Sequence, residues 1–159
     1  GILIAALKKV KNNNFIEMVY IVGGGSKIDF FKDIVKRISN IKIKFTGSIN
    51  RRDLNKIYSI SHIIVLPSFS EGFPKVIAEA SAYSCVPIVS NVGSLGQYIN
   101  KKNGILLKNK DVADVYNAII LLKNNRTLLK KLSVECNKIS EKFTYVKYLK
   151  SINQIIRKK

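Results

Sequence analysis

The apolar and polar positions of the chain follow two alternating patterns. Short runs rich in Val and Ile, typical of strands, cover residues 18–22, 41–45, 63–66, 87–90 and 104–107. Apolar residues recur at every third or fourth position, as in amphipathic helices, in residues 2–10, 28–38, 52–59, 74–84, 112–122, 127–142 and 145–156. Strands that alternate with helices predict an α/β fold with a doubly wound, Rossmann-like parallel sheet.

The first element departs from this order. A doubly wound domain normally opens on a strand, whereas residues 2–10 have helical spacing and no Met precedes them. We therefore expect residues 1–159 to be one domain that is truncated at its N-terminal side and begins inside a larger protein.

The stretch most suggestive of a binding site is residues 66–80, LPSFSEGFPKVIAEA. Pro67 ends an apolar run, and Pro74 suits the first turn of a helix. The loop between them leaves the carboxyl end of a buried strand, where open α/β sheets bind ligands. Gly72 lets a ligand approach the backbone. An anionic or hydroxyl-rich ligand is favoured by the free N–H groups at the helix start, those around Phe73, Lys75 and Val76.

Two carboxylates flank this loop. Glu71 lies just before the expected helix and Glu79 about two turns inside it, at roughly 3.6 residues per turn. Acidic residues at a helix start often only complement the helix dipole, so the pair alone is weak support for a site. The whole stretch of residues 66–80 is stronger support for a site. Pro-Ser, then Glu-Gly-Phe-Pro, then a second Glu after seven residues resembles the donor-site signature of retaining GT-B glycosyltransferases of the family 4 type.

The resemblance extends over almost the whole chain. Residues 19–25, VYIVGGG, look like the strand and Gly-rich turn of the nucleotide-sugar domain, and residues 45–49, FTGSI, look like the segment that borders the nucleoside base. Residues 88–93 and 103–107 resemble the strands and loops that follow. The resemblance implies the donor-binding half of a GT-B enzyme, with the N-terminal acceptor domain absent because it would precede Gly1.

The resemblance also assigns roles to residues. Glu79 would accept hydrogen bonds from the ribose hydroxyls, and Glu71, the catalytic candidate, would contact hydroxyls of the transferred sugar. A carboxylate repels a diphosphate, so both acids should address hydroxyls. The other donor-binding residues implied are Gly47 and Ile49 beside the base, and Gly72, Phe73, Lys75 and Val76, whose N–H groups would hold sugar and phosphate oxygens.

Some positions depart from the family pattern. The Arg and Lys that usually neutralise the leaving diphosphate would precede Gly1. Ser84 stands where Gly is common, and Gln97 stands where Glu is frequent. These changes bear on the identity of the sugar more than on the fold.

The implied activity is that of a hexosyltransferase. It would move a sugar with retention from a UDP- or GDP-sugar to an acceptor in surface polysaccharide or glycolipid synthesis, such as lipopolysaccharide or capsule. No nucleophile or general base is evident, which agrees with catalysis by positioning and electrostatic stabilisation. We expect no required metal and no cofactor besides the donor. We also expect this chain alone to bind a donor weakly and to transfer nothing.

The composition adds a charge that needs explanation. Lys and Arg number 28 against 10 Asp and Glu, a formal net charge of +18. The lysines are scattered, so a solvated surface explains them better than a nucleic-acid site, and peripheral attachment to an anionic membrane is compatible with them. There is no apolar run of the ~20 residues that would span a bilayer. Together with two isolated cysteines, Cys85 and Cys136, this predicts a cytoplasmic protein, if attached then at the inner face of the membrane.

Two other hypotheses about the function stay open. The first is a non-enzymatic, Rossmann-like nucleotide-binding module, although residues 23–27, GGGSK, fit neither a Walker loop nor a dinucleotide fingerprint. The second is a basic nucleic-acid-binding domain, for which the chain lacks basic motifs interleaved with aromatic residues.

Overall fold

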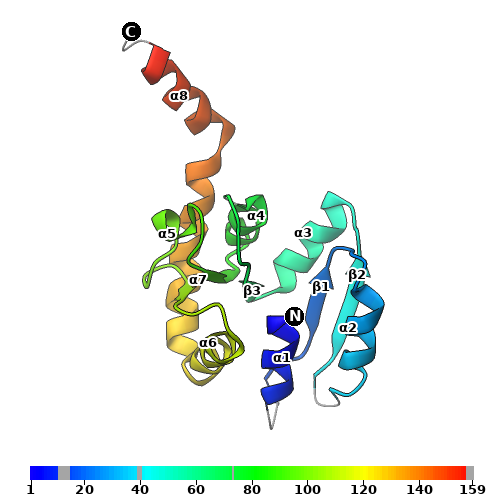
Figure 1. Cartoon of the computed structure of the whole chain (residues 1–159). Coiled ribbons are helices and arrows are strands. Elements are labelled where there is room, and N and C mark those ends of the chain that lie inside the picture. Colours follow the sequence, from blue (N-terminus) through cyan, green and yellow to red (C-terminus); the bar gives the residue numbers. More distant parts are fainter. Residues whose placement is uncertain (11–14, 39–40, 73, 157–159) are drawn as a thin grey trace.

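The structure is a computed structural model, and it describes residues 1–10, 15–38, 41–72 and 74–156 (Figure 1). Helices and strands alternate from the start, as the sequence predicts. Their order is α1 (Ile2–Lys9), β1 (Val19–Val22), α2 (Ile28–Val35), β2 (Ile43–Gly47), α3 (Arg51–Ile60), β3 (Ile63–Leu66), α4 (Lys75–Ala82), β4 (Val86–Ser90), α5 (Leu95–Tyr98), β5 (Ile105–Leu107), α6 (Val112–Asn124), α7 (Arg126–Ser140), the 3₁₀ turn η1 (Glu141–Phe143) and α8 (Tyr145–Ile156).

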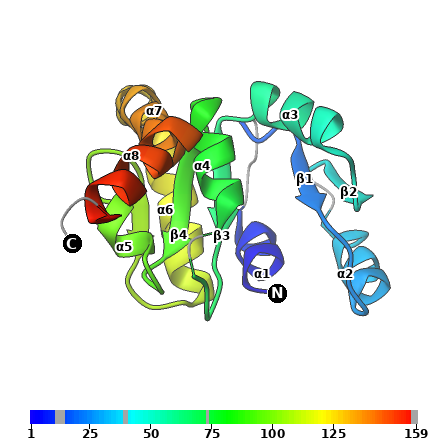
Figure 2. The same ribbon diagram turned by 90° about the horizontal axis from the view of Figure 1, so that it is seen from above.

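All pairings between these strands are parallel. β1 pairs with β2, and β4 lies between β3 and β5. Among the described residues the strands therefore form two sheets, where a single sheet was expected. The usual doubly wound strand order is 3-2-1-4-5-6, in which the first strand separates the second from the fourth. β1 to β5 correspond to the second to sixth strands of that order. The position that the first strand takes in that order lies between β1 and β3. Figure 2 shows α1 lying between the two sheets.

The core is centred on β4. Every residue of this strand is buried, because β3 and β5 lie on either side of it and α4 and α7 pack against it. Pro87 interrupts a central strand, which normally excludes proline for want of an N–H group. It is tolerated here because β5 pairs with β4 only from Ile88 onward.

Local side-chain bonds fix where helices begin. Asn50, Asp111 and Asn125 stand before α3, α6 and α7, and each side chain accepts a hydrogen bond from a backbone N–H three residues on. These caps satisfy donors that the helix itself leaves without acceptors. In the cap of α6, Asp111 Oδ1 lies 2.8 Å from the Asp114 nitrogen.

The last helix lies apart from this body. α8 projects away from the rest of the molecule and contacts mainly η1 (Figure 1). Several of its apolar side chains are exposed, with Tyr145 at 73% and Val146 at 74%. Within the described residues, none of the helices combines the length and the apolarity that crossing a membrane requires.

Candidate functional site

The loop between β3 and α4 carries the first candidate acid. Glu71 is half-buried and Gly72 exposed, while Phe73, a predicted donor-binding residue, lies outside the described residues. Pro74 is the N-cap of α4, with φ −71° and ψ 117°, so it stands one position before the first turn and not within it as expected. Its carbonyl accepts the Ile77 N–H at 3.0 Å.

The start of α4 presents the expected backbone donors. Lys75 and Val76 occupy the first two helical positions, whose N–H groups have no acceptor within a helix. Lys75 is exposed and Val76 half-buried. This short helix end thus offers two N–H groups to a ligand oxygen, next to Glu71 and Gly72 in the sequence.

The second acid lies closer to the helix start than expected. Glu79 is four residues after Lys75, just over one turn into α4 rather than two, because the helix begins only at Lys75. Its charge acts on Tyr58 of α3, which is only 6% exposed. Burial, and secondarily the charges of Glu79 and Cys85, raise the pKa of the Tyr58 hydroxyl to about 12. Tyr58 is therefore a neutral phenol at physiological pH.

A second loop, residues 91–94 between β4 and α5, packs against the first. The Ser94 amide and hydroxyl both donate to the Gly72 carbonyl oxygen, at 3.2 Å and 3.1 Å. Gly93 has a φ of +54°, and a Cβ there would overlap the Glu71 carbonyl oxygen and lie 2.5 Å from that of Gly72. Only glycine fits this approach without displacing the Glu71 backbone.

The predicted base-binding residues lie on the other sheet. Gly47 ends β2 with a φ of +65°, and Ile49 is half-buried in the connection to α3. The Gly23 N–H donates to the Gly47 carbonyl at 2.9 Å, so the Gly-rich turn after β1 is joined to this segment. The structure thus gathers the predicted residues into two groups, one at the end of each sheet: Gly47 and Ile49, and Glu71, Gly72, Lys75, Val76 and Glu79.

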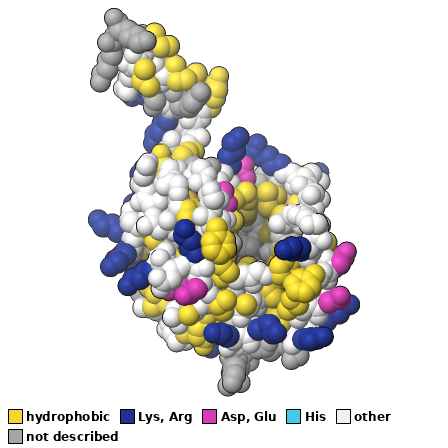
Figure 3. Space-filling model, in the orientation of Figure 1, with side chains coloured by type: hydrophobic (Ala, Val, Ile, Leu, Met, Phe, Trp, Pro, Cys, Tyr) yellow, Lys and Arg dark blue, Asp and Glu magenta, His cyan; other side chains and the backbone are white. Residues whose placement is uncertain are grey.

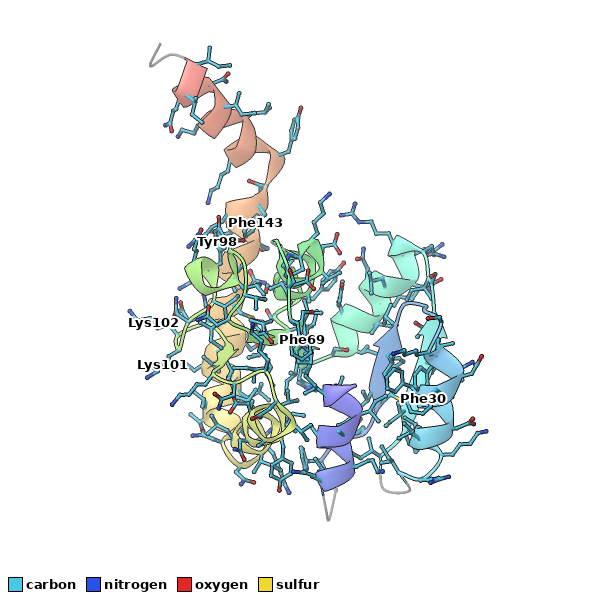
Figure 4. The ribbon with its side chains drawn as sticks, viewed as in Figure 1. Phe30, Phe69, Tyr98, Lys101, Lys102 and Phe143 are labelled. Atoms are coloured by element: carbon cyan, nitrogen blue, oxygen red, sulfur yellow. The ribbon has the colours of Figure 1, made fainter. Side chains whose placement is uncertain are left out.

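An exposed aromatic side chain accompanies the site. Phe69 belongs to the same loop as Glu71 and is 71% exposed; Figure 4 places it near the middle of the view. Figure 3, in the same orientation, shows a hollow near the centre of this face, with hydrophobic side chains around it and acidic ones at its upper edge. No pattern in the sequence gave Phe69 a role.

A separate cavity lies at the opposite end of the strands. Its volume is about 460 Å³, and its lining includes His62, which precedes β3, and Ser84, which precedes β4. It therefore lies at the amino ends of these strands, whereas Glu71 and Ser94 follow their carboxyl ends. Among the described residues, no three His, Cys, Asp or Glu side chains gather as a metal site would require.

Comparison with known proteins identifies the family. Residues 2–142 match the sequence family described as Glycosyl transferases group 1. The chain belongs to this family. An Escherichia coli relative of this group 1 chain, "UDP-Gal:alpha-D-GlcNAc-diphosphoundecaprenol alpha-1,3-galactosyltransferase", is 30% identical over 154 residues, which are 94% of this chain and 40% of the relative.

Solved structures show the same fold. A glycosyltransferase from Rickettsia africae superposes with a TM-score of 0.83 at 24% identity, over 99% of this chain and 43% of that one. The Anabaena protein HepE, in complex with UDP-glucose, gives a TM-score of 0.81 at 17% identity, over 99% of this chain and 44% of that one. The group 1 chain described here is therefore a Rossmann-like α/β domain of the GT-B type. It spans about two-fifths of the length of these matched proteins.

Two features of the site could not be predicted from the sequence. The contact of Gly93 and Ser94 with the Glu71–Gly72 backbone joins residues more than 20 positions apart. The effect of Glu79 on Tyr58 likewise depends on how α3 and α4 pack. A Gly-Ser pair after a strand, or a Tyr within a helix, is too common to indicate either contact.

Proposed function

We propose that this chain is the donor-binding half of a family 4 type glycosyltransferase, which moves a sugar from a nucleotide sugar to an acceptor with retention. The observation that carries the proposal is the pair Glu71 and Glu79 around the start of α4, in a group 1 domain. The donor is a UDP- or GDP-sugar, and the acceptor belongs to surface polysaccharide or glycolipid synthesis. The name of the Escherichia coli relative, a galactosyltransferase with a lipid-linked acceptor, supports both assignments.

The proposed mechanism relies on positioning. Glu79 accepts hydrogen bonds from the ribose, and Glu71 accepts them from hydroxyls of the transferred sugar. The N–H groups of Lys75 and Val76, at the positive end of α4, bind phosphate or sugar oxygens. No step requires a nucleophile from the protein, since holding the donor and stabilising the charge of the leaving diphosphate lower the barrier.

The remaining machinery lies outside residues 1–159 in this proposal. An N-terminal domain supplies the acceptor site and the basic residues that neutralise the diphosphate. The complete enzyme works in the cytoplasm at the inner face of the membrane, where an anionic lipid surface attracts its lysines. The net charge of +18 and the exposed apolar side chains of α8 support such peripheral attachment.

Binding of nucleotides tests the proposal directly. We expect UDP or GDP, with the matching nucleotide sugars, to raise the Tm of residues 1–159 in a thermal-shift panel that also contains NAD, ATP and oligonucleotides. Because the proposal assigns the acceptor site to a domain outside residues 1–159, we expect no sugar transfer by these residues alone. A Tm that responds to none of the UDP or GDP compounds contradicts the donor site, and transfer by the chain alone contradicts the need for a second domain.

Two variants separate the roles of the acids. Glu79→Ala should weaken nucleoside diphosphate and nucleotide sugar equally, by about ten- to a hundredfold, since a hydrogen bond to a charged group contributes roughly 1.5–3 kcal/mol. Glu71→Ala should remove only the additional affinity that the sugar brings. Titration calorimetry with both ligands measures this. If the acids merely support the helix, each variant lowers stability without distinguishing the ligands.

A further inference from the structure

Glu71 lies in a loop whose own sequence restricts the backbone conformation only weakly. It belongs to neither β3 nor α4, and it precedes Gly72, the residue type with the widest conformational freedom. A Cβ on Gly72 would meet nothing within 4 Å, so the loop is not packed closely on that side. A carboxylate that must match sugar hydroxyls needs a backbone held in place by something else.

The loop after β4, residues 91–94, holds the Glu71 backbone in place. β3 and β4 are adjacent, with Leu66 paired to Val89, so their following loops leave the sheet side by side. Gly93 packs against the Glu71 carbonyl so closely that no side chain fits between them. The Ser94 amide and hydroxyl donate to the next carbonyl, that of Gly72. Both peptide carbonyls that follow Glu71 are thus contacted by the same two residues.

The second loop is itself anchored in the core. Leu95, directly after Ser94, is fully buried, as is Ile99 at the end of α5. The Leu95 N–H donates to the Val92 carbonyl at 3.1 Å, which closes the turn that contains Gly93 and Ser94. The contact with Glu71 and Gly72 therefore comes from a fixed element.

We propose that Gly93 and Ser94 are positioning residues, which hold Glu71 where it can accept hydrogen bonds from the transferred sugar. Gly93 acts by its close approach to the Glu71 carbonyl, and Ser94 by its two donors to the Gly72 carbonyl. This inference rests on the proposed function, because it assigns the sugar contact to Glu71. It adds that the loop after β4 determines how strongly Glu71 binds the transferred sugar.

Ser94→Ala is the test, because it removes one hydrogen-bond donor and leaves the buried Leu95 unchanged. We expect its affinity for UDP-galactose to fall about two- to tenfold, the range of one neutral hydrogen bond, with that for UDP nearly unchanged. GDP and GDP-mannose replace this pair if the thermal-shift panel selects guanine. Ser94→Thr keeps the hydroxyl and should restore the affinity. Ser59→Ala is the matched control, since Ser59 also donates to a carbonyl, that of Lys56 at 2.8 Å, but at the far end of α3.

A measurement without ligand separates this inference from the proposed function. In ¹⁵N-edited NMR spectra, Ser94→Ala should shift the Glu71 and Gly72 amide signals and speed hydrogen exchange of the residue 94 amide, whereas Ser59→Ala should do neither. If the wild-type chain binds no nucleotide sugar but these signals respond, the proposed function has failed and the contact between the loops stands. Unchanged signals, or equal losses of UDP and UDP-galactose affinity, overturn the positioning role.

Gly93→Ala gives a second variant with a larger expected effect. Its Cβ would overlap the Glu71 carbonyl, and alanine is strained at a φ of +54°. We expect a loss of the sugar-dependent affinity greater than that of Ser94→Ala. If Gly93→Ala does not fold, Ser94→Ala and Ser94→Thr decide the question. A folded Gly93→Ala protein with wild-type affinity for UDP-galactose contradicts the proposal.

Discussion

Both cysteine thiols are buried in the core and bonded to backbone carbonyls. The Cys85 sulfur lies 3.2 Å from the carbonyl oxygens of Tyr58 and Ser61, and the Cys136 sulfur lies 3.5 Å from the Cys85 carbonyl. Burial raises the pKa of Cys85 to about 11, and that of Cys136 to about 12. These thiols serve packing, since a reactive cysteine needs an accessible thiolate.

We predict that neither thiol of the native protein reacts with Ellman's reagent at pH 8. The thiolate fraction is suppressed by the raised pKa values, and the sulfurs are not accessible to the reagent. Both should react at once in guanidinium chloride, and a Ser26→Cys variant should add one thiol that reacts in the native state because Ser26 is exposed. Rapid native reaction of two thiols would contradict the buried placement.

The same shift gives the sign of a pH effect on folding. Because the folded pKa of Cys85 is about 11, above the ordinary 9.0, its contribution to stability is complete below about pH 9 and is lost as the pH rises toward 11.

At the scale of elements, periodicity predicted most of the fold. Each expected strand and helix exists, with ends that move by a few residues; the expected strand at 41–45, for example, is β2 at Ile43–Gly47. α5 was missed because its four residues are too short for a period to show. The division into two sheets was also missed, since strand pairing depends on contacts distant in sequence and not on local pattern.

For the candidate site, the sequence predicted which residues form it, and the roles assigned to them stay predictions. Glu71 and Glu79 were singled out by the family resemblance of the whole stretch 66–80, because two acids near a helix start are weak support for a site on their own. Ser84, noted as replacing a common Gly, has a φ of 63°, which explains why glycine suits that turn. Gly93 and Ser94 could not be found in this way, because what marks them is a contact with the neighbouring loop. Local sequence thus marks the two acids as candidates, but it does not indicate the loop that contacts the Glu71 backbone.

The cap of α6 allows a prediction about an element. Asp111→Ala removes the acceptor for the Asp114 N–H, and we expect it to lower the free energy of unfolding by about 1 kcal/mol. α6 packs against α1 and α7, so the loss should appear in global urea denaturation followed by circular dichroism. Glu135→Ala is the control. It removes only an exposed ion pair with Lys138 and should cost less than about 0.5 kcal/mol. Equal effects of the two variants would argue against the cap.

At the scale of the whole molecule, the unusual property is charge. The formal net charge is +18, and Figure 3 shows Lys and Arg side chains spread around the outline of the visible face rather than gathered into one patch. Four of the acidic side chains already pair with lysines one turn away: Asp29, Asp33, Asp53 and Glu135. A dispersed charge of this kind attracts any polyanion without recognising its sequence.

We therefore predict that binding to oligonucleotides is weak, independent of sequence and steeply dependent on salt. A protein that neutralises several phosphates releases their counterions, so affinity should fall at least about a hundredfold between roughly 50 and 200 mM salt. Fluorescence anisotropy with two unrelated oligonucleotides at a series of NaCl concentrations measures both the slope and the selectivity. Sedimentation with vesicles is the parallel measurement. Vesicles containing phosphatidylserine should retain the protein at low salt, and purely phosphatidylcholine vesicles should not. Sequence-selective binding that persists at physiological ionic strength would show instead that the lysines form a nucleic-acid site.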